Sequence, residues 1–218
     1  MHATGRPQFT MRPATLDDNP QLGRLIQTRE MWMRASGFSG HRELIHVLSS
    51  VSSSAGAEVM VLEEPGDEPG QEAVLLGCTA LTHAVTAKGW EPAERRVRAM
   101  AMQRTYSHPA PRYRQDRLGQ LMTWWVADYV ARRYADVEWI RSTVRSPALL
   151  KLARDRDGWR EVREVRDAAH ARVHLIQREP KQMDGLRALI ASPPGLVVDS
   201  AVARGGGKVG LRIVPNPT

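Results

Sequence analysis

A basic segment near the middle of the chain carries the residues best suited to bind an anion. Arg112, Arg114 and Arg117 lie close together, and Gly119 follows them where apolar residues begin to recur at helical spacing. The run before them, Val97 to Ser107, has the length and pattern of a strand. A helix N-terminus carries unpaired N–H groups and a positive partial charge, and glycine permits close backbone approach. This order of strand, basic loop and helix predicts a phosphate-binding site, with a solvated basic helix cap as the alternative.

Other reactive residue types give weaker signals. Cys78 is the single cysteine and lies in an apolar run, which favours a small buried hydrophobe over a nucleophile. His41 and His46 are five residues apart, so on a helix they would point roughly 140° away from each other. We therefore expect neither cysteine chemistry nor a metal site.

The scaffold before the basic segment alternates between strand and helix patterns. The patterns predict a strand at 9–14, helices at 17–35 and 42–50, and strands at 58–62 and 73–81 that form a hairpin. Thr15 to Asp18 supply helix-capping chemistry, and the segment from Thr82 to Glu94 has the composition of a loop.

After the basic segment the pattern continues in the same way. It predicts a helix from Leu118, a strand at 137–144, a short helix from Ser146 to Gly158, and strands at 160–165 and 171–178. The tail differs in composition, with Pro193, Pro194 and three consecutive glycines, and it could hold one helix and a hairpin. The chain therefore reads as one α/β domain at 1–179 with a C-terminal extension at 180–218.

Composition and charge narrow the class of protein. The chain has 218 residues, of which 42% are hydrophobic and 25% charged, typical of a folded globular protein. Its longest apolar stretch is much shorter than a membrane span, and one cysteine excludes an intramolecular disulfide, so we expect a cytoplasmic protein without membrane contact. All but four of the 31 basic residues are arginines, which favours a nucleotide-bearing cofactor or a nucleic acid as partner, or else reflects the codon usage of a GC-rich genome.

Taken in order, these segments resemble the GNAT superfamily of acyl-CoA-dependent N-acyltransferases from about Thr10 to Arg178. The stretch Arg114-Gln-Asp-Arg-Leu-Gly119 is similar to the family's acyl-CoA motif, with Arg117 at a position where glycine is usual. The stretch from Ser146 to Trp159 resembles a second family segment, in which Ala153 replaces a tyrosine that often acts as general acid. The resemblance implies a mixed, mostly antiparallel central sheet flanked by helices.

The resemblance also implies which residues bind acetyl-CoA or another acyl-CoA as cosubstrate. Backbone groups at the end of the predicted strand at 97–107 would hold the pantetheine, and the loop with the first helical turn would hold the pyrophosphate. These residues are Thr105, Tyr106, Ser107, Arg114, Gln115, Asp116, Arg117, Leu118, Gly119 and Gln120.

Acyl transfer to an amine needs a neutral nucleophile and a proton donor for the thiolate leaving group. The predicted strand at 97–107 contains no carboxylate, so we take His83 and Glu94, with Glu91 as a neighbour, as acid–base candidates at the mouth of the cleft. The amine would approach from the side of Trp32 and His83. The proton donor to the thiolate stays unassigned.

The sequence thus predicts an N-acyltransferase that moves an acyl group, acetyl above all, from acyl-CoA to an amine of a small molecule or peptide. Two alternatives stay open: a transferase of the same fold that uses aminoacyl-tRNA as donor, and a binding module that has lost the chemistry. A homodimer is compatible with this fold class.

Overall fold

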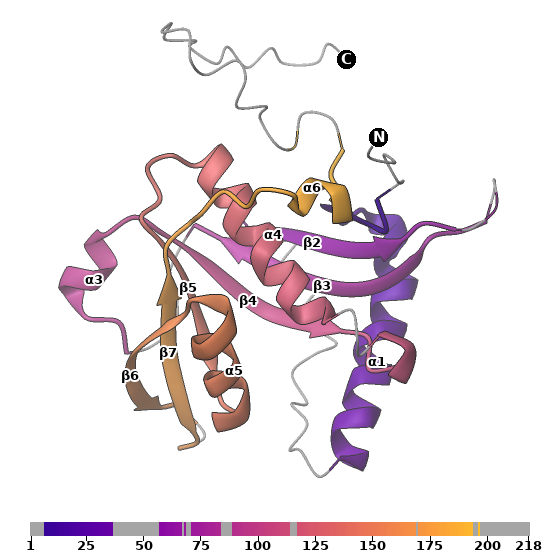
Figure 1. Ribbon diagram of the computed structural model, residues 1–218. Coiled ribbons are helices and arrows are strands. Elements are labelled where there is room, and N and C mark those ends of the chain that lie inside the picture. Colours follow the sequence, from indigo (N-terminus) through magenta and orange to yellow (C-terminus); the bar gives the residue numbers. More distant parts are fainter. Residues whose placement is uncertain are drawn as a thin grey trace, which may run out of the picture.

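One eight-stranded sheet runs through the molecule (Figure 1). The computed structural model describes residues 7–36, 57–66, 68, 71–83, 89–113, 117–168, 170–193 and 196. The strand order is β6-β7-β5-β4-β3-β2-β1-β8. The strands are β1 (Phe9–Pro13), β2 (Ala57–Glu64), β3 (Val74–Thr82), β4 (Ala99–Ser107), β5 (Trp139–Val144), β6 (Arg160–Arg166), β7 (Arg172–Arg178) and β8 (Ile190–Ala191).

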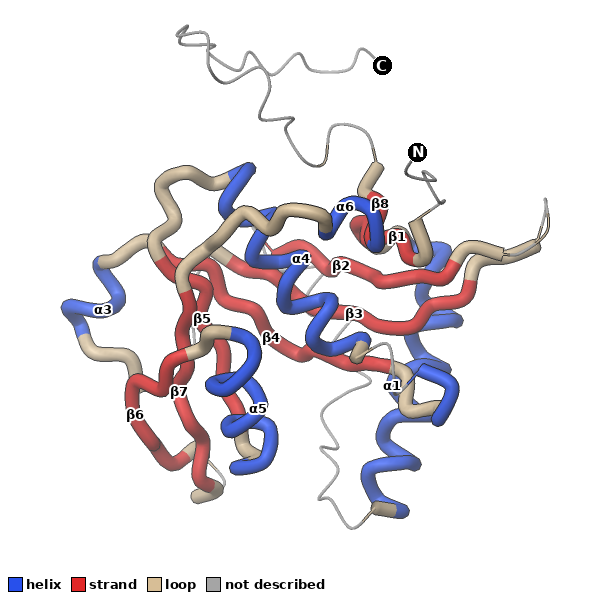
Figure 2. The backbone as a smooth tube through the Cα atoms, in the orientation of Figure 1, coloured by secondary structure: helices blue, strands red, loops and turns tan. Residues whose placement is uncertain are grey.

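Helices cover both faces of this sheet (Figure 2). They are α1 (Asn19–Ala35), α3 (Pro92–Arg96), α4 (Leu118–Arg133), α5 (Pro147–Asp157) and α6 (Leu186–Leu189), with short 3-10 turns η1 (Leu16–Asp18) and η2 (Pro111–Tyr113). Of the strand pairs among the described residues, only β4–β5 and β1–β8 are parallel. The predicted α/β class with a mixed, mostly antiparallel sheet is therefore confirmed.

The two parallel central strands separate soon after they pair. β4 and β5 share register only at three positions, from Ala99 with Trp139 to Ala101 with Arg141. Beyond Ala101, β4 continues to Ser107 on β3 alone, and its residues change from buried to partly exposed. Residues 102–107 of β4 and 142–144 of β5 do not pair with each other, and we call the region between them the wedge.

A separate hydrophobic core lies on each face of the β1–β4 half of the sheet. On one face, Leu22 and Leu25 of α1 pack with Val61, Leu75 and Cys78. The apolar stripe at i, i+3 and i+4 that predicted this helix is the stripe that faces the sheet.

The larger core lies under α4 on the opposite face. Met122 and Val126 of α4 are fully buried and pack with Met100 and Leu76 of the sheet. A Cβ added at Gly77 would lie 2.7 Å from the Met122 sulfur, so the glycine lets α4 approach β3 closely. This contact fixes the height of α4 above the sheet.

The start of α1 is held by an acidic cap. Asp18 accepts a hydrogen bond from the Thr15 backbone N–H (2.7 Å) and forms a 2.8 Å ion pair with Arg12. The hydrogen bonds from Arg12 hold the pKa of Asp18 at about 2, below its usual value. The capping role expected of Thr15 to Asp18 is thus present.

Two segments differ from the sequence-based expectation. The stretch predicted as a loop before β4 contains α3, whose Pro92 stands at the first helical position and whose cap pairs Glu91 with Glu94. The helix expected at 42–50 lies outside the described residues, as does the possible hairpin in the tail beyond residue 196.

The described part of the tail packs on the domain. Leu186 and Ile190 join the core under α4, and β8 pairs with β1. The Trp125 indole N–H donates to the Ser192 hydroxyl (2.9 Å). The division of the chain at residue 180 stays a prediction. Within the described residues, no helix has both the length and the apolar character needed to cross a bilayer.

Candidate functional site

The start of α4 presents backbone donors to the outside. The Arg117 carbonyl accepts the first helical hydrogen bonds, from the N–H groups of Gln120 (2.7 Å) and Leu121 (3.1 Å). The N–H groups of Leu118 and Gly119 come before these bonds and have no acceptor within the helix. With the helix dipole, two such donors are suited to bind a phosphate or another anion.

The space beside Gly119 is open on the side where a side chain would stand. A Cβ added at Gly119 would meet no atom within 4 Å. Arg117 has φ 48° and ψ 48°, the left-handed conformation that glycine adopts without strain. Glycine is usual at this position of the acyl-CoA motif. The backbone of Arg117 has the left-handed dihedral angles that favour glycine, although the residue is arginine. The Arg117 guanidinium is exposed at the mouth of this site.

The other predicted donor-site residues lie at the end of β4. The Thr105 hydroxyl lies 2.9 Å from the Thr79 hydroxyl of β3, and Ser107 pairs with Gly77. Tyr106 packs on the opposite face, against α1. Along the edge of β4 that faces the wedge, the backbone has no strand partner among the described residues.

A β-bulge turns this part of β4. The register slips between Cys78 and Ala80 of β3, and Arg104 on β4 has φ 52°. A left-handed residue that is not glycine costs roughly 1 kcal/mol or more, so the surrounding pairs must hold it in place. The bulge gives β4 its bend at the point where the wedge opens.

Gln120 and Leu118 contribute differently from the expectation. The Gln120 side chain donates to Asp157 at the end of α5 (2.6 Å), and the Leu118 side chain is buried in the core. Burial raises the pKa of Asp157, although hydrogen bonds from Gln120 and Trp124 and the charge of Arg178 oppose the rise. Only the backbone of Leu118 is available to a ligand.

The loop before α4 is anchored on the sheet. The Tyr113 hydroxyl donates to Glu64 at the end of β2 (3.0 Å), and the Arg112 guanidinium lies 4.4 Å from the centre of the Tyr113 ring. Arg114, Gln115 and Asp116 lie outside the described residues, so their predicted role in phosphate binding stays a prediction.

His83 lies far from the start of α4. Its ring contacts that of Tyr134, 4.9 Å between centroids, and Tyr134 caps the other end of the helix. Because α4 has 16 residues, its two ends are about 24 Å apart. Trp32 lies on α1, where the Arg29 guanidinium is 4.6 Å from the centre of its ring, and a shared acceptor route along Trp32 and His83 stays a prediction.

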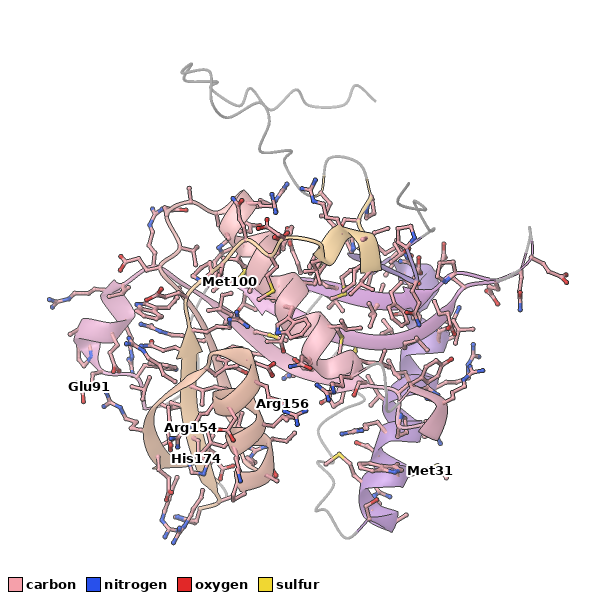
Figure 3. All side chains as sticks on the ribbon, viewed as in Figure 1. Met31, Glu91, Met100, Arg154, Arg156 and His174 are labelled. Carbon is pink, nitrogen blue, oxygen red and sulfur yellow. The ribbon has the colours of Figure 1, made fainter. Side chains whose placement is uncertain are left out.

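Glu94 lies beyond the start of β4, whereas the donor-site residues lie at its end. Its carboxylate accepts the Glu91 backbone N–H (2.7 Å) and pairs with Arg163 of β6 (2.5 Å). Figure 3 places Glu91, at the start of α3, on the opposite side of the molecule from Met31 on α1. In these contacts Glu94 caps α3 and ties it to the sheet edge.

The described residues offer neither a ready nucleophile nor a metal-binding cluster. Burial raises the pKa of the Cys78 thiol to about 12, so it remains protonated at neutral pH. No group of three or more His, Cys, Asp or Glu side chains in the described part of the chain is arranged to hold a metal ion.

Sequence reasoning missed two features of the site. The bulge at Arg104 has no glycine or proline to mark it, and Asp157 meets Gln120 only because α5 returns toward α4. Neither feature leaves a local signal in the sequence.

Three solved structures show what this arrangement is similar to. An acetyltransferase of the GNAT family from Listeria monocytogenes superposes with a TM-score of 0.56 at 15% identity, over 78% of this chain and 94% of that one. The spermidine N-acetyltransferase from Vibrio cholerae, in complex with CoA and spermine, gives a TM-score of 0.53 at 14% identity, over 79% and 96%. An aminoglycoside N(6')-acetyltransferase from Legionella pneumophila gives 0.51 at 9% identity, over 82% and 95%.

Comparison by sequence adds nothing to this result. No known sequence family matches the chain, and no curated protein does. The similarity is therefore one of three-dimensional structure: the chain has the GNAT fold, as its sequence predicted.

Proposed function

We propose that the protein is an acyl-CoA-dependent N-acyltransferase that moves an acetyl group to an amine of a small molecule or peptide. The main support is the start of α4, where two backbone N–H groups have no acceptor within the helix, beside the point where β4 separates from β5. This arrangement occurs in a chain with the GNAT fold. An acyl-CoA would supply an activated thioester at this place. The two activities named for the Vibrio and Legionella proteins are both acetyl transfers to amines, which supports this reaction class.

The residues at the start of α4 fit a pyrophosphate. The N–H groups of Leu118 and Gly119 face outward, the space at Gly119 is open, and Arg117 adds an exposed guanidinium. Charge-assisted hydrogen bonds of this kind are about twice as strong as neutral ones. Arg117 and Gly119 would thus hold the charged part of the donor.

The free edge of β4 fits the amide-bearing arm of the donor. Among the described strands, β4 pairs with β5 only from Ala99 to Ala101, so from residue 102 onward its strand pairing is with β3 alone. An extended chain with amide groups pairs with such an edge as an added strand would. Thr105, Tyr106 and Ser107 would therefore position the arm through their backbone.

The proton transfers are assigned to no side chain of β4. The strand carries no carboxylate, and both His83 and Glu94 lie away from the wedge in the contacts described above. We propose that water in the wedge takes the proton from the amine. The proposal does not use His83 or Glu94 as acid or base.

Thermal denaturation with and without acetyl-CoA tests the proposal. A ligand at 100 times its dissociation constant adds about 2.7 kcal/mol to the stability, so the melting temperature should rise by several degrees. Acetylpantetheine, which lacks the phosphates, is the matched control and should give a much smaller shift. Release of free CoA thiol in the presence of an amine tests turnover. No shift at millimolar acetyl-CoA would refute the donor site.

Aminoacyl-tRNA as donor is the second candidate. The exposed Arg117 at a position where glycine suits the backbone favours it, because its charge is available to a phosphate chain. A donor tRNA would bind with strong salt dependence, and the protein would then show no response to acyl-CoA. A homodimer and a peptide acceptor stay predictions.

A further inference from the structure

The face of the wedge that α1 covers is basic. Met100 and Met102 pack under α4, so Ala101 between them faces the α1 side of the sheet. Arg141 pairs with Ala101 in parallel register and shares that face, and Arg145 comes directly after the last residue of the same strand, Val144. Arg141 therefore lies on the α1 side, and Arg145 stands at the end of that strand.

The closed end of the wedge holds one of these charges in a buried position. Arg141 is 2% exposed and its guanidinium lies 4.4 Å from the centre of the Trp90 ring. Its Nη1 group has no hydrogen-bond partner, and burial lowers its pKa. A buried cation without an ion-paired carboxylate adds positive potential to the wedge beside it.

The overhanging half of α1 brings a third arginine to this side. Ile26 packs against Ala80 and Tyr106, and Arg29 follows Ile26 three residues later on the same helix face. The Arg29 guanidinium is half-buried, lies 4.6 Å from the Trp32 ring centre, and has its pKa lowered by burial. No carboxylate among the described residues forms an ion pair with it.

Charged side chains from β4, α1 and the end of β5 act on the hydroxyl of Tyr106. Burial raises the pKa of its hydroxyl to about 12, and the charges of Arg104 on β4 and Arg145 after β5 both oppose that rise. The charge of Glu30 on α1 also acts on the same hydroxyl. The two strand arms and α1 thus place charged groups around one phenol.

Two carboxylates on this side each lie near an arginine. Glu30 lies 3.7 Å from Arg34, and Asp167 lies 2.8 Å from Arg145. Arg29 adds a further positive charge. A second positive group, such as the far end of a polyamine, would meet like charge here, which costs several kcal/mol at a close interface.

We propose that the acceptor is an amine that also carries an anionic group, a carboxylate or a phosphate, and that Arg29 with Arg145 binds this group on the α1 side of the wedge. Its amine would then point toward the unpaired edge of β4. The acetylation of this amine rests on the proposed function. The preference for binding an anionic amine does not depend on it.

Matched pairs of amines test it. Ornithine and putrescine differ by one carboxylate, and phosphoethanolamine and ethanolamine differ by one phosphate. Binding of each amine to the protein without acyl donor is measured by titration calorimetry, and acetylation by release of CoA thiol. The anionic member of at least one pair should bind and react at least tenfold better, and the pair that shows the larger ratio identifies the anion.

Variants assign the preference to its residues. Arg29→Gln should reduce the preference for the anionic amine over its partner about tenfold and leave the KM for acetyl-CoA unchanged. Arg29→Lys should retain most of that preference. Arg24→Gln is the matched control, because Arg24 lies exposed on the other side of α1. Arg145→Gln gives a second reading if Arg29→Gln fails to fold.

Two outcomes would overturn the inference. One is a preference for putrescine and ethanolamine over their anionic partners. The other is an anionic preference that neither Arg29→Gln nor Arg145→Gln alters. If no acyl-CoA binds and no thiol is released with any amine, the proposed function fails, and the calorimetric ratio still decides the acceptor class.

Discussion

The two ends of α4 differ in how their backbone and side chains are satisfied. At the first end, the N–H groups of Leu118 and Gly119 lack helical acceptors, and a Cβ added at Gly119 would meet no atom within 4 Å. At the other end, the Tyr134 N–H bonds the Val130 carbonyl (2.9 Å), and the rings of Tyr129 and Tyr134 meet edge to face. The first end is open to a ligand, and the second is filled by the protein itself.

This difference shows where chemistry can be inferred from residue types. His83, at the filled end, is a reactive residue type in an aromatic contact, whereas the open end offers mainly backbone groups. A functional site on this fold is marked more clearly by donors without partners than by a titratable side chain.

A negative charge at the open end should have the largest effect. Gly119→Glu should weaken acetyl-CoA binding about a hundredfold, close to 3 kcal/mol, because its carboxylate would face the pyrophosphate. Stability should stay equal or rise by up to about 1 kcal/mol, since glycine is a poor helix former and an acid suits a helix N-terminus. Calorimetry and urea denaturation measure the two effects. Gly23→Glu in α1, also with open space at its Cβ, is the control and should leave binding intact.

Removing one hydroxyl near the filled end should lower the stability and leave the ligand affinity unchanged. The Tyr129 hydroxyl donates to Glu58 (3.1 Å), so Tyr129→Phe should lower the free energy of unfolding by about 1 to 2 kcal/mol. The affinity for acetyl-CoA should not change. A loss of affinity equal to that of Gly119→Glu would mean that the two ends are not independent.

Replacing Arg117 by glycine separates its backbone strain from its charge. Arg117→Gly removes a side chain from a left-handed position, so the free energy of unfolding should stay equal or rise by about 1 kcal/mol. Acetyl-CoA binding should weaken, because the variant lacks the guanidinium that the proposal places at the pyrophosphate. If the arginine serves RNA instead, the variant should bind tRNA more weakly, and log affinity should fall with log salt by roughly 0.7 to 0.9 per phosphate contacted.

A smaller effect is expected at Asp157, which touches the first turn of α4. Burial raises its folded pKa, so the folded state binds more protons than the unfolded state in the window above the usual value near 4. Stability from this group therefore falls as the pH rises through that window. Asp157→Asn should remove the penalty and stabilise the protein by up to about 1 kcal/mol at pH 7 but not at pH 3. Denaturation at the two pH values measures this; equal differences at both would contradict it.

The smallest effect should come from the residues first considered for acid–base chemistry. His83→Ala and Glu94→Gln should leave kcat with acetyl-CoA within about twofold, because both side chains lie away from the wedge. Glu94→Gln should also loosen the contact with Arg163, which contributes little to stability because the pair is partly exposed. A loss of kcat above tenfold with normal stability would return either residue to the mechanism.

Much of the sheet and its helices could be predicted because their signals are local. Alternating or continuous apolar runs marked β1 to β7, and the stripe of Leu22, Leu25 and Ile26 marked the buried face of α1. The helix α3 was missed although Pro92 and the Glu91–Glu94 cap were readable, because five residues are too few to show periodicity.

The site could be predicted only as far as its backbone. The strand, basic loop and Gly119 located the open end of α4, because helix geometry itself leaves donors there. The positions of His83 and Glu94 depend on contacts with Tyr134 and Arg163, far away in sequence. Local patterns carry no information about such contacts.

The pairing of β8 with β1 also has a consequence for how the molecule is made. Phe9 of the first strand pairs with Ile190, so the outer edge of β1 stays uncovered until residue 190 has been synthesised. At the rate of a ribosome this takes on the order of ten seconds or more, and exposed strand edges recruit other strands. Newly made chains therefore pass through a period in which chaperone contact, or pairing with a neighbouring nascent chain, competes with the closing of their own sheet.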